Sequence, residues 1–251
     1  MTERPLLTLV CGAPGAGKTL LSTSLGIELQ KLTGQRVLVL YTDPACPPLP
    51  LLFPGSDRDR AGTLARVLCK TNPTRSDVLR EILTDRRMPD LGFLGFTLRD
   101  APDTYPIYGR SYASGLLDLL LTLCPYVVVD GSAEPERDSL SAAALHKADA
   151  VLRVRPCGPE AAVYASVHPE LTKAGRLNLD VLSGTVPQSL RADEDRPDAE
   201  LPYAPSIPER LRRGLGPAGA FRDRAFREET VRLCHVLTAL KEESGEETGH
   251  D

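Results

Sequence analysis

The chain has 251 residues, of which 41% are hydrophobic and 25% charged, as in a folded globular protein. Its net charge of −4 gives no reason to expect non-specific DNA binding through overall charge. No apolar run approaches the roughly 20 residues that cross a bilayer. The N-terminus also lacks the basic region and apolar core of a secretory signal, so we expect a cytoplasmic protein. The six cysteines form no C-x-x-C pair, which leaves a zinc or redox motif unsupported.

The first motif lies close to the N-terminus. Residues 12–19 read GAPGAGKT and match the phosphate-binding pattern G-x-x-x-x-G-K-[ST]. The apolar run Leu6–Val10 predicts a strand before the motif, and Leu20–Lys31 has helical spacing after it. In this context glycine N–H groups converge on phosphates, Lys18 reaches the β- and γ-phosphates, and Thr19 coordinates Mg²⁺. The alternative is an ordinary glycine-rich turn.

Strand and helix patterns alternate along the rest of the chain. The predicted strands are Val37–Tyr41, Gly92–Leu98, Tyr126–Asp130, Ala150–Val154, Asn178–Leu182 and Leu201–Tyr203. The predicted helices are Thr63–Leu68, Arg75–Leu83 with Ser76 as its N-cap, Ser111–Leu123, Ser139–Lys147, Pro159–His168 and Arg222–Glu243. This order predicts an α/β P-loop NTPase fold, with a mostly parallel sheet and helices on both faces. We expect one domain over residues 1–243 and a disordered acidic tail over 244–251.

Two aspartates follow predicted strands at the edge where the phosphate loop lies. Asp130 ends the run YVVVD, where a carboxylate holds Mg²⁺ through water; the alternative is a capping role in the following loop. Asp43 precedes Pro44, where it is placed to orient the attacking water. The alternative for Asp43 is an Asp-Pro turn.

Five segments, taken in order, resemble the MinD/ParA-like P-loop ATPases over roughly residues 5–215. They are the phosphate loop, VLVLYTDP, YVVVDGS, KADAVLRVRP and LPYAPSIPERLRRG. Within that superfamily, LGFLGF and the stretch TYPIYGRSYASGLLDLLLTLCPYVVVDGS are most similar to the TadZ/CpaE-type pilus-assembly ATPases.

The resemblance implies ATP and Mg²⁺ as cofactors and a role for each matching residue. Asp130 and Thr19 match the metal-binding positions, Asp43 the position near the attacking water, and Lys18 the catalytic lysine. The residues implied to bind nucleotide are Gly12, Ala13, Pro14, Gly15, Ala16, Gly17, Lys18, Thr19 and Leu20 in the loop, with Pro202 and Tyr203 beside the base. No N-K-x-D motif of the GTPase kind is present, which also favours ATP.

The chain departs from the family at three positions. Ala13 stands where relatives often carry a lysine that reaches the partner's phosphates, Pro14 replaces a glycine, and Tyr41 stands where a second acidic residue is common. Because cationic contacts to a transferring phosphoryl group strongly affect rate, we expect slow or partner-stimulated hydrolysis.

The main functional hypothesis is a homodimer assembled by ATP, which localises or assembles a pilus, secretion or conjugation apparatus, at the inner face of the membrane if partners recruit it there. One alternative is a scaffold that binds ATP without turnover. Another is a P-loop small-molecule kinase with 58–66 as an arginine-bearing lid. DNA partitioning would need a basic face, and the acidic balance argues against it. The C-terminal helix is expected to dock on the sheet through Phe226, Leu233, Leu237 and Leu240 rather than to bind a membrane.

Overall fold

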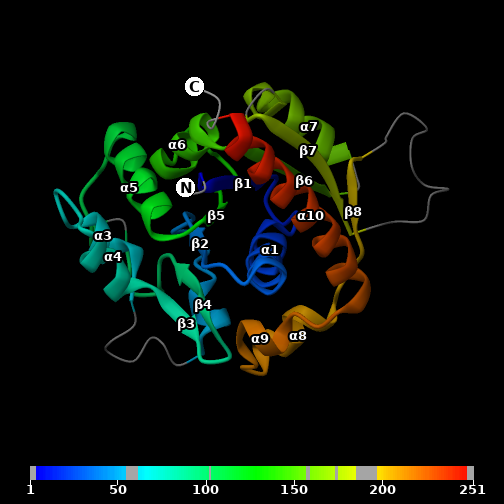
Figure 1. Ribbon diagram of the computed structural model, residues 1–251, viewed down its shortest axis with the longest axis horizontal. Coiled ribbons are helices and arrows are strands. Elements are labelled where there is room, and N and C mark those ends of the chain that lie inside the picture. Colours follow the sequence, from blue (N-terminus) through cyan, green and yellow to red (C-terminus); the bar gives the residue numbers. More distant parts are fainter. Residues whose placement is uncertain are drawn as a thin grey trace.

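The computed structural model describes residues 4–54, 62–101, 103–156, 159–172, 175–184 and 197–247. In these residues eight strands form one sheet, in the order β3-β4-β2-β5-β1-β6-β7-β8 (Figure 1). All paired neighbours run parallel except β3, which is antiparallel to β4. The strands are β1 Leu6–Gly12, β2 Val37–Tyr41, β3 Leu83–Asp85, β4 Met88–Leu94, β5 Tyr126–Asp130, β6 Ala150–Pro156, β7 Leu177–Ser183 and β8 Ala199–Leu201.

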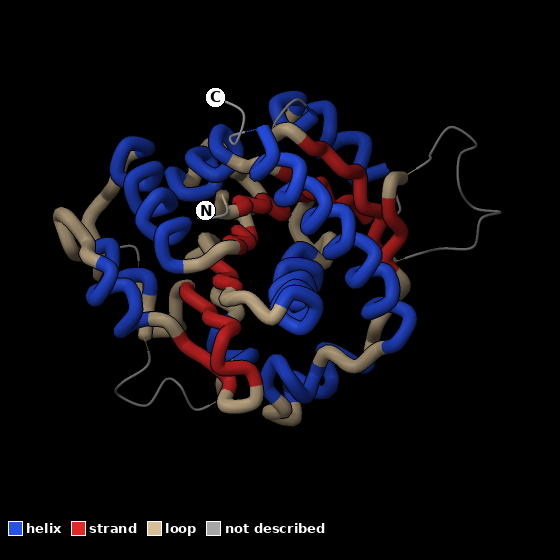
Figure 2. Tube along the Cα trace, in the orientation of Figure 1, coloured by secondary structure: helices blue, strands red, loops and turns tan. Residues whose placement is uncertain are grey.

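Helices cover both faces of this sheet, as the α/β prediction requires (Figure 2). They are α1 Lys18–Thr33, α2 Leu49–Leu52, α3 Leu64–Leu68, α4 Arg75–Glu81, α5 Arg110–Leu123, α6 Ser139–Lys147, α7 Pro159–Val167, the 3₁₀ helix Pro169–Thr172, α8 Ser206–Arg212, α9 Gly216–Ala220 and α10 Arg224–Glu247. No helix of the described ranges is both long and apolar enough to span a membrane.

The central strands are apolar at every position because both of their faces are buried. On β1, Leu6 and Val10 pack with α1, α8 and α10 in one apolar cluster, while Leu7 and Leu9 pack with α3, α5 and α6 in another. The strands β2 and β5 divide between the two clusters in the same alternating way. This packing fixes the register of the strands, and therefore which loops meet at the carboxyl edge of the sheet.

Three predicted elements agree with the structure in type and bounds, namely Val37–Tyr41, Tyr126–Asp130 and Ser139–Lys147. The predicted strand Gly92–Leu98 is shifted, since β4 ends at Leu94 and Leu98 lies in a loop with 70% of its surface exposed. The last strand, predicted at Leu201–Tyr203, lies two residues earlier. The short helices α2, α8 and α9 were not predicted, because four to seven residues are too few for a clear period.

The helix predicted over Arg75–Leu83 is shorter and has a different cap. Thr74 is the N-cap: its hydroxyl accepts from the Asp77 N–H, and the Asp77 carboxylate accepts from the Thr74 N–H. This reciprocal pair is a capping box, so Ser76 is not the cap. The helix ends at Glu81 because Leu83 begins β3, where it pairs with Phe93 of β4.

The predicted tail is also partly wrong, because α10 continues to Glu247 and residues 244–247 are helical. Ser244 is buried; its hydroxyl donates to the Leu240 carbonyl and accepts from Arg176. This docking holds the last turns in place despite their acidic sequence. Residues 248–251 lie outside the described part of the chain.

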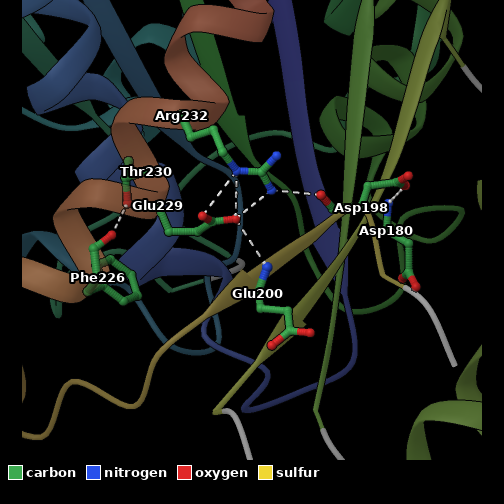
Figure 3. A network of polar contacts seen from close by, with 7 residues as sticks. All are labelled: Asp180, Asp198, Glu200, Phe226, Glu229, Thr230 and Arg232. Carbon is green, nitrogen blue, oxygen red and sulfur yellow. Dashed lines mark hydrogen bonds and ion pairs between the residues drawn. The ribbon is translucent and has the colours of Figure 1, made fainter.

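The predicted apolar face of α10 is confirmed, since Phe226, Leu233 and Leu237 are buried and Leu240 packs against the same cluster. The helix lies against α1 and the edge strand β8 (Figure 1). Figure 3 shows how it also covers the edge of β8. Glu229 accepts from the Glu200 backbone N–H at 3.2 Å and pairs with Arg232, which donates to the Asp198 carbonyl at 2.7 Å.

We expect Glu229→Ala to lower the free energy of unfolding by about 1–2 kcal/mol, because it leaves the half-buried Glu200 N–H and the Arg232 guanidinium without this acceptor. Urea denaturation measures the change. The matched control is Glu228→Ala, whose exposed ion pair with Arg224 should contribute much less to stability. Equal losses for both variants would contradict a stabilising role for the Glu229 network.

Candidate nucleotide site

The loop after β1 has the conformation that a glycine-rich phosphate loop needs. Gly12, Gly15 and Gly17 all have positive φ, at 145°, 71° and 92°. At Gly12 an added Cβ would lie 1.9 Å from the Val154 carbonyl oxygen of β6, so a side chain does not fit. Gly17 precedes the first turn of α1 and has no side-chain cap. The loop therefore leads into a helix N-terminus with free N–H groups, which is a site suited to phosphate.

Lys18 begins α1, and its ammonium lies over the loop. Its Nζ donates to the Gly12 and Ala13 carbonyl oxygens, each at 3.0 Å. Burial lowers the pKa of Lys18, and the nearby carboxylates of Asp130 and Asp43 oppose this shift. The cation is thus held beside the loop on two uncharged acceptors, which charged phosphate oxygens could replace.

Thr19 and Asp130 come together although 111 residues separate them. The Thr19 hydroxyl donates to Asp130 Oδ2 at 2.7 Å, and the Ser22 hydroxyl donates to Asp130 Oδ1 at 3.1 Å. Only 6% of Asp130 is exposed. Burial raises its pKa to about 6, against the Thr19 and Ser22 hydrogen bonds and the Lys18 charge. A buried carboxylate of this kind is stabilised by a cation.

The donor set fits Mg²⁺. The hydroxyl and the carboxylate are hard oxygen ligands, and no group of three or more His, Cys, Asp or Glu that could hold a metal is found in the described ranges. Mg²⁺ prefers such sparse protein coordination, with phosphates and water as its other ligands. Thr19 and Asp130 would hold the ion.

Asp43 lies at the same edge, just after β2, and is partly exposed. The register pairs Tyr41 with Asp130, and Asp43 is close enough to influence the pKa values of both Lys18 and Asp130. Its Oδ1 also accepts from the Ala45 N–H at 2.8 Å. Asp43 therefore both stabilises the turn after β2 and lies beside the nucleotide site.

Pro202 and Tyr203 follow β8 at this edge too. Ser183 of β7 pairs with Leu201, and its hydroxyl would lie 3.0 Å from a Cβ at Gly17, so the ends of β7 and β8 flank the phosphate loop. Tyr203 is 74% exposed, while Pro202 is half-buried.

Several polar residues behind the site were not predicted. Ser22 lies one turn after Lys18, and this helical spacing could have indicated it. Thr42 donates its hydroxyl to the Asp130 carbonyl oxygen at 3.2 Å and shares a 2.8 Å hydrogen bond with Ser141. That contact joins the loop after β2 to α6, which are far apart in sequence, so no local pattern predicts it.

Tyr41 and the segment 58–66 bear on the two alternative functions, the non-hydrolysing scaffold and the small-molecule kinase. Tyr41, in place of an acidic residue, is fully buried and hydrogen-bonded to the Thr23 hydroxyl at 2.8 Å, so it contributes no charge to the site. Of the possible lid at 58–66, residues 58–61 lie outside the described residues, and Arg66 lies on α3 in an ion pair with Glu81.

No protein-family profile matches the chain, and no curated protein sequence matches it. Solved structures do match. A ParA family ATPase from Chlorobium tepidum aligns with a TM-score of 0.74 at 14% identity, over 92% of this chain and 98% of that one. MinD complexed with Mg-ADP from Pyrococcus horikoshii aligns at 0.68 and 18%, over 94% and 98%. Cobyrinic acid a,c-diamide synthase from Mycobacterium smegmatis, with an ATP analog and magnesium, aligns at 0.60 and 16%, over 93% and 94%. The chain has the P-loop NTPase fold that ParA and MinD share.

Proposed function

We propose that the chain binds Mg²⁺-ATP at the carboxyl edge of its sheet and hydrolyses it slowly. The observation that carries this proposal is the convergence of the phosphate loop, Lys18, Thr19 and Asp130 on one edge. The fold alone does not decide function, since the structural neighbours include both ParA and MinD ATPases and a diamide synthase.

Each residue has a defined task in the proposed cycle. Lys18 exchanges its two carbonyl acceptors for phosphate oxygens, and the loop N–H groups bind the phosphate chain. Thr19 and Asp130 would hold the Mg²⁺ ion, and the Thr19 hydroxyl donates its hydrogen bond to Asp130. Bound Mg²⁺ supplies charge neutralisation for the phosphates. Asp43 orients the attacking water, and Tyr203 packs against the base.

The slow turnover in this proposal follows from the absence of a cationic side chain at position 13 of the phosphate loop. Ala13 is buried and offers only its carbonyl, to Lys18. No cation at that position can therefore reach a partner's phosphates. Removing a cationic contact of this kind costs orders of magnitude in rate.

The proposed output is a homodimer that forms with ATP and separates after hydrolysis. By resemblance of the stretch from Thr104 to Ser132, we further propose that the dimer localises or assembles a pilus, secretion or conjugation apparatus. Partners of that apparatus would bring the protein to the inner face of the membrane.

The test combines solution molar mass with phosphate release for Asp43→Ala. We expect Mg²⁺-ATP to convert monomer to dimer, and Asp43→Ala to hold the dimer while phosphate release falls about 100-fold or more, because a residue that handles the water's proton contributes this much. The matched control is Asp90→Ala, an exposed aspartate of β4 distant from the site, which should leave turnover unchanged.

Each other outcome counts against part of the proposal. Turnover that survives Asp43→Ala would remove Asp43 from the mechanism. A dimer that is independent of ATP, without turnover, would favour the scaffold. A monomer whose ATP consumption depends on an added metabolite would favour the kinase or a synthase.

A further inference from the structure

A stripe of seven exposed or partly exposed residues runs along α10, opposite its buried apolar face. Apart from one adjacent pair, its successive members are three or four residues apart, and its two ends are 18 residues, or five full turns, apart. The stripe consists of Arg224, Arg227, Glu228, Val231, His235, Thr238 and Glu242. Figure 1 shows α10 at the surface, with α1 and β8 beside it.

The charges of this helix are distributed against its dipole. Basic residues occupy the beginning, no acidic residue lies in the first turn, and no basic residue lies in the last. A helix dipole favours the reverse order. Asp223 caps the helix through the Phe226 N–H, but Arg222, Arg224 and Arg227 surround it. Helix stability therefore does not account for this arrangement, whereas binding to another charged surface would.

The basic end of the stripe borders a groove of about 800 Å³, which we call the basic groove. It is lined by Lys31, Ala218, Phe221, Arg222, Arg224, Arg227, Glu228 and Val231. Lys31 and Arg227 share one buried carboxylate, Glu28, at 2.7 and 3.0 Å. Arg224 has only an exposed ion pair with Glu228, and Arg222 has no side-chain partner among the described residues. The basic groove therefore has more positively than negatively charged side chains, although the net charge of the whole protein is negative.

We propose that the basic groove binds the acidic end of α10 from a second copy, with the two helices antiparallel. This pairing places Arg224 opposite the partner's Glu242, and Val231 opposite the partner's His235. Glu242 and Glu243 are exposed and lie at the acidic end. A single two-fold axis then pairs the basic end of each α10 with the acidic end of the other, because both copies carry the same stripe.

The acidic end cannot fill the groove of its own chain. Arg227 and Glu242 lie on the same rigid helix, about 22 Å apart along its axis at 1.5 Å per residue. A flat membrane is a poor fit, because the large apolar side chain of the groove, Phe221, is buried in its wall rather than exposed. The interface is separate from the nucleotide site and does not need ATP.

The test is sedimentation equilibrium of the full chain without nucleotide, at low salt and high protein concentration. Two variants reverse one end each: R222E/R224E and E242R/E243R. We expect each to weaken self-association at least about tenfold, since like charges then face each other. A chain carrying all four changes should associate like the wild type, and a mixture of the two variants should form the heterodimer. The control is Arg213→Glu at the C-cap of α8, outside the stripe.

A monomeric wild type under these conditions would overturn the proposal. So would reversal variants that associate normally, or a four-fold variant that is folded by circular dichroism yet does not recover. Lys18→Ala separates this association from the ATP-dependent dimer, because it should abolish only the latter. An association lost with Lys18→Ala would belong to the nucleotide site, and α10 would have no part in it.

Discussion

Gly12→Ala is expected to lower the free energy of unfolding by about 3–5 kcal/mol and to abolish nucleotide binding. Two costs combine at this position. The backbone φ of 145° is one that side chains with Cβ rarely adopt, and the new methyl would lie 1.9 Å from the Val154 carbonyl oxygen. Since β1 and β6 pair at this residue, relief of the clash must either separate two central strands or reshape the loop. Urea denaturation and titration with a fluorescent ATP analogue measure the two effects.

Gly34→Ala separates the two costs. Gly34 ends α1 with φ of 64°, and no atom lies within 4 Å of an added Cβ. It should therefore show the conformational cost alone, about 1–2 kcal/mol, with normal nucleotide binding. If Gly12→Ala were no worse than Gly34→Ala, close approach of β6 would not be what requires glycine in the loop.

Local patterns predicted the centre of the fold and one side of the site. The phosphate loop, α1 and the strands β2 and β5 are long or strongly patterned, and the sequence is consistent with the structure at each level there. The parallel order then brings Asp130 and Asp43 to the loop, because the carboxyl ends of parallel strands share an edge.

The elements and contacts that were not predicted correctly all depend on tertiary contacts. Leu83 fits a helical spacing, but pairing with Phe93 places it in β3. Glu246 and Glu247 were predicted to lie in a disordered tail, yet the burial of Ser244 keeps their turn helical. The Thr42–Ser141 contact behind Asp130 likewise depends on strand order rather than on spacing.

Asp130→Asn should make the ligand-free protein more stable at neutral pH. The folded state raises the pKa of this carboxyl from 3.8 to about 6, chiefly through burial, so folding favours its protonated form. The stabilising contribution is complete below about pH 4 and is lost as the pH rises through 6. The asparagine variant should therefore exceed the wild type by up to about 3 kcal/mol at pH 8, and by little at pH 4. Urea denaturation at the two pH values measures this difference.

Asp130→Asn should also remove Mg²⁺-dependent ATP binding and most of the ATP hydrolysis. Asparagine can still accept the hydrogen bond from the Thr19 hydroxyl, but it brings no negative charge to a cation. The dependence of ATP affinity on Mg²⁺ should therefore disappear, and hydrolysis should fall at least about 100-fold. Ser22→Ala is the matched control: it removes one hydrogen bond to Asp130 and keeps the charge, so Mg²⁺ dependence should persist. A variant that is stabilised yet still binds Mg²⁺-ATP normally would show that the buried charge of Asp130 serves something other than the metal. Stability and activity moving in opposite directions would instead indicate that the carboxylate is kept, at a cost to the empty protein, for the bound ion.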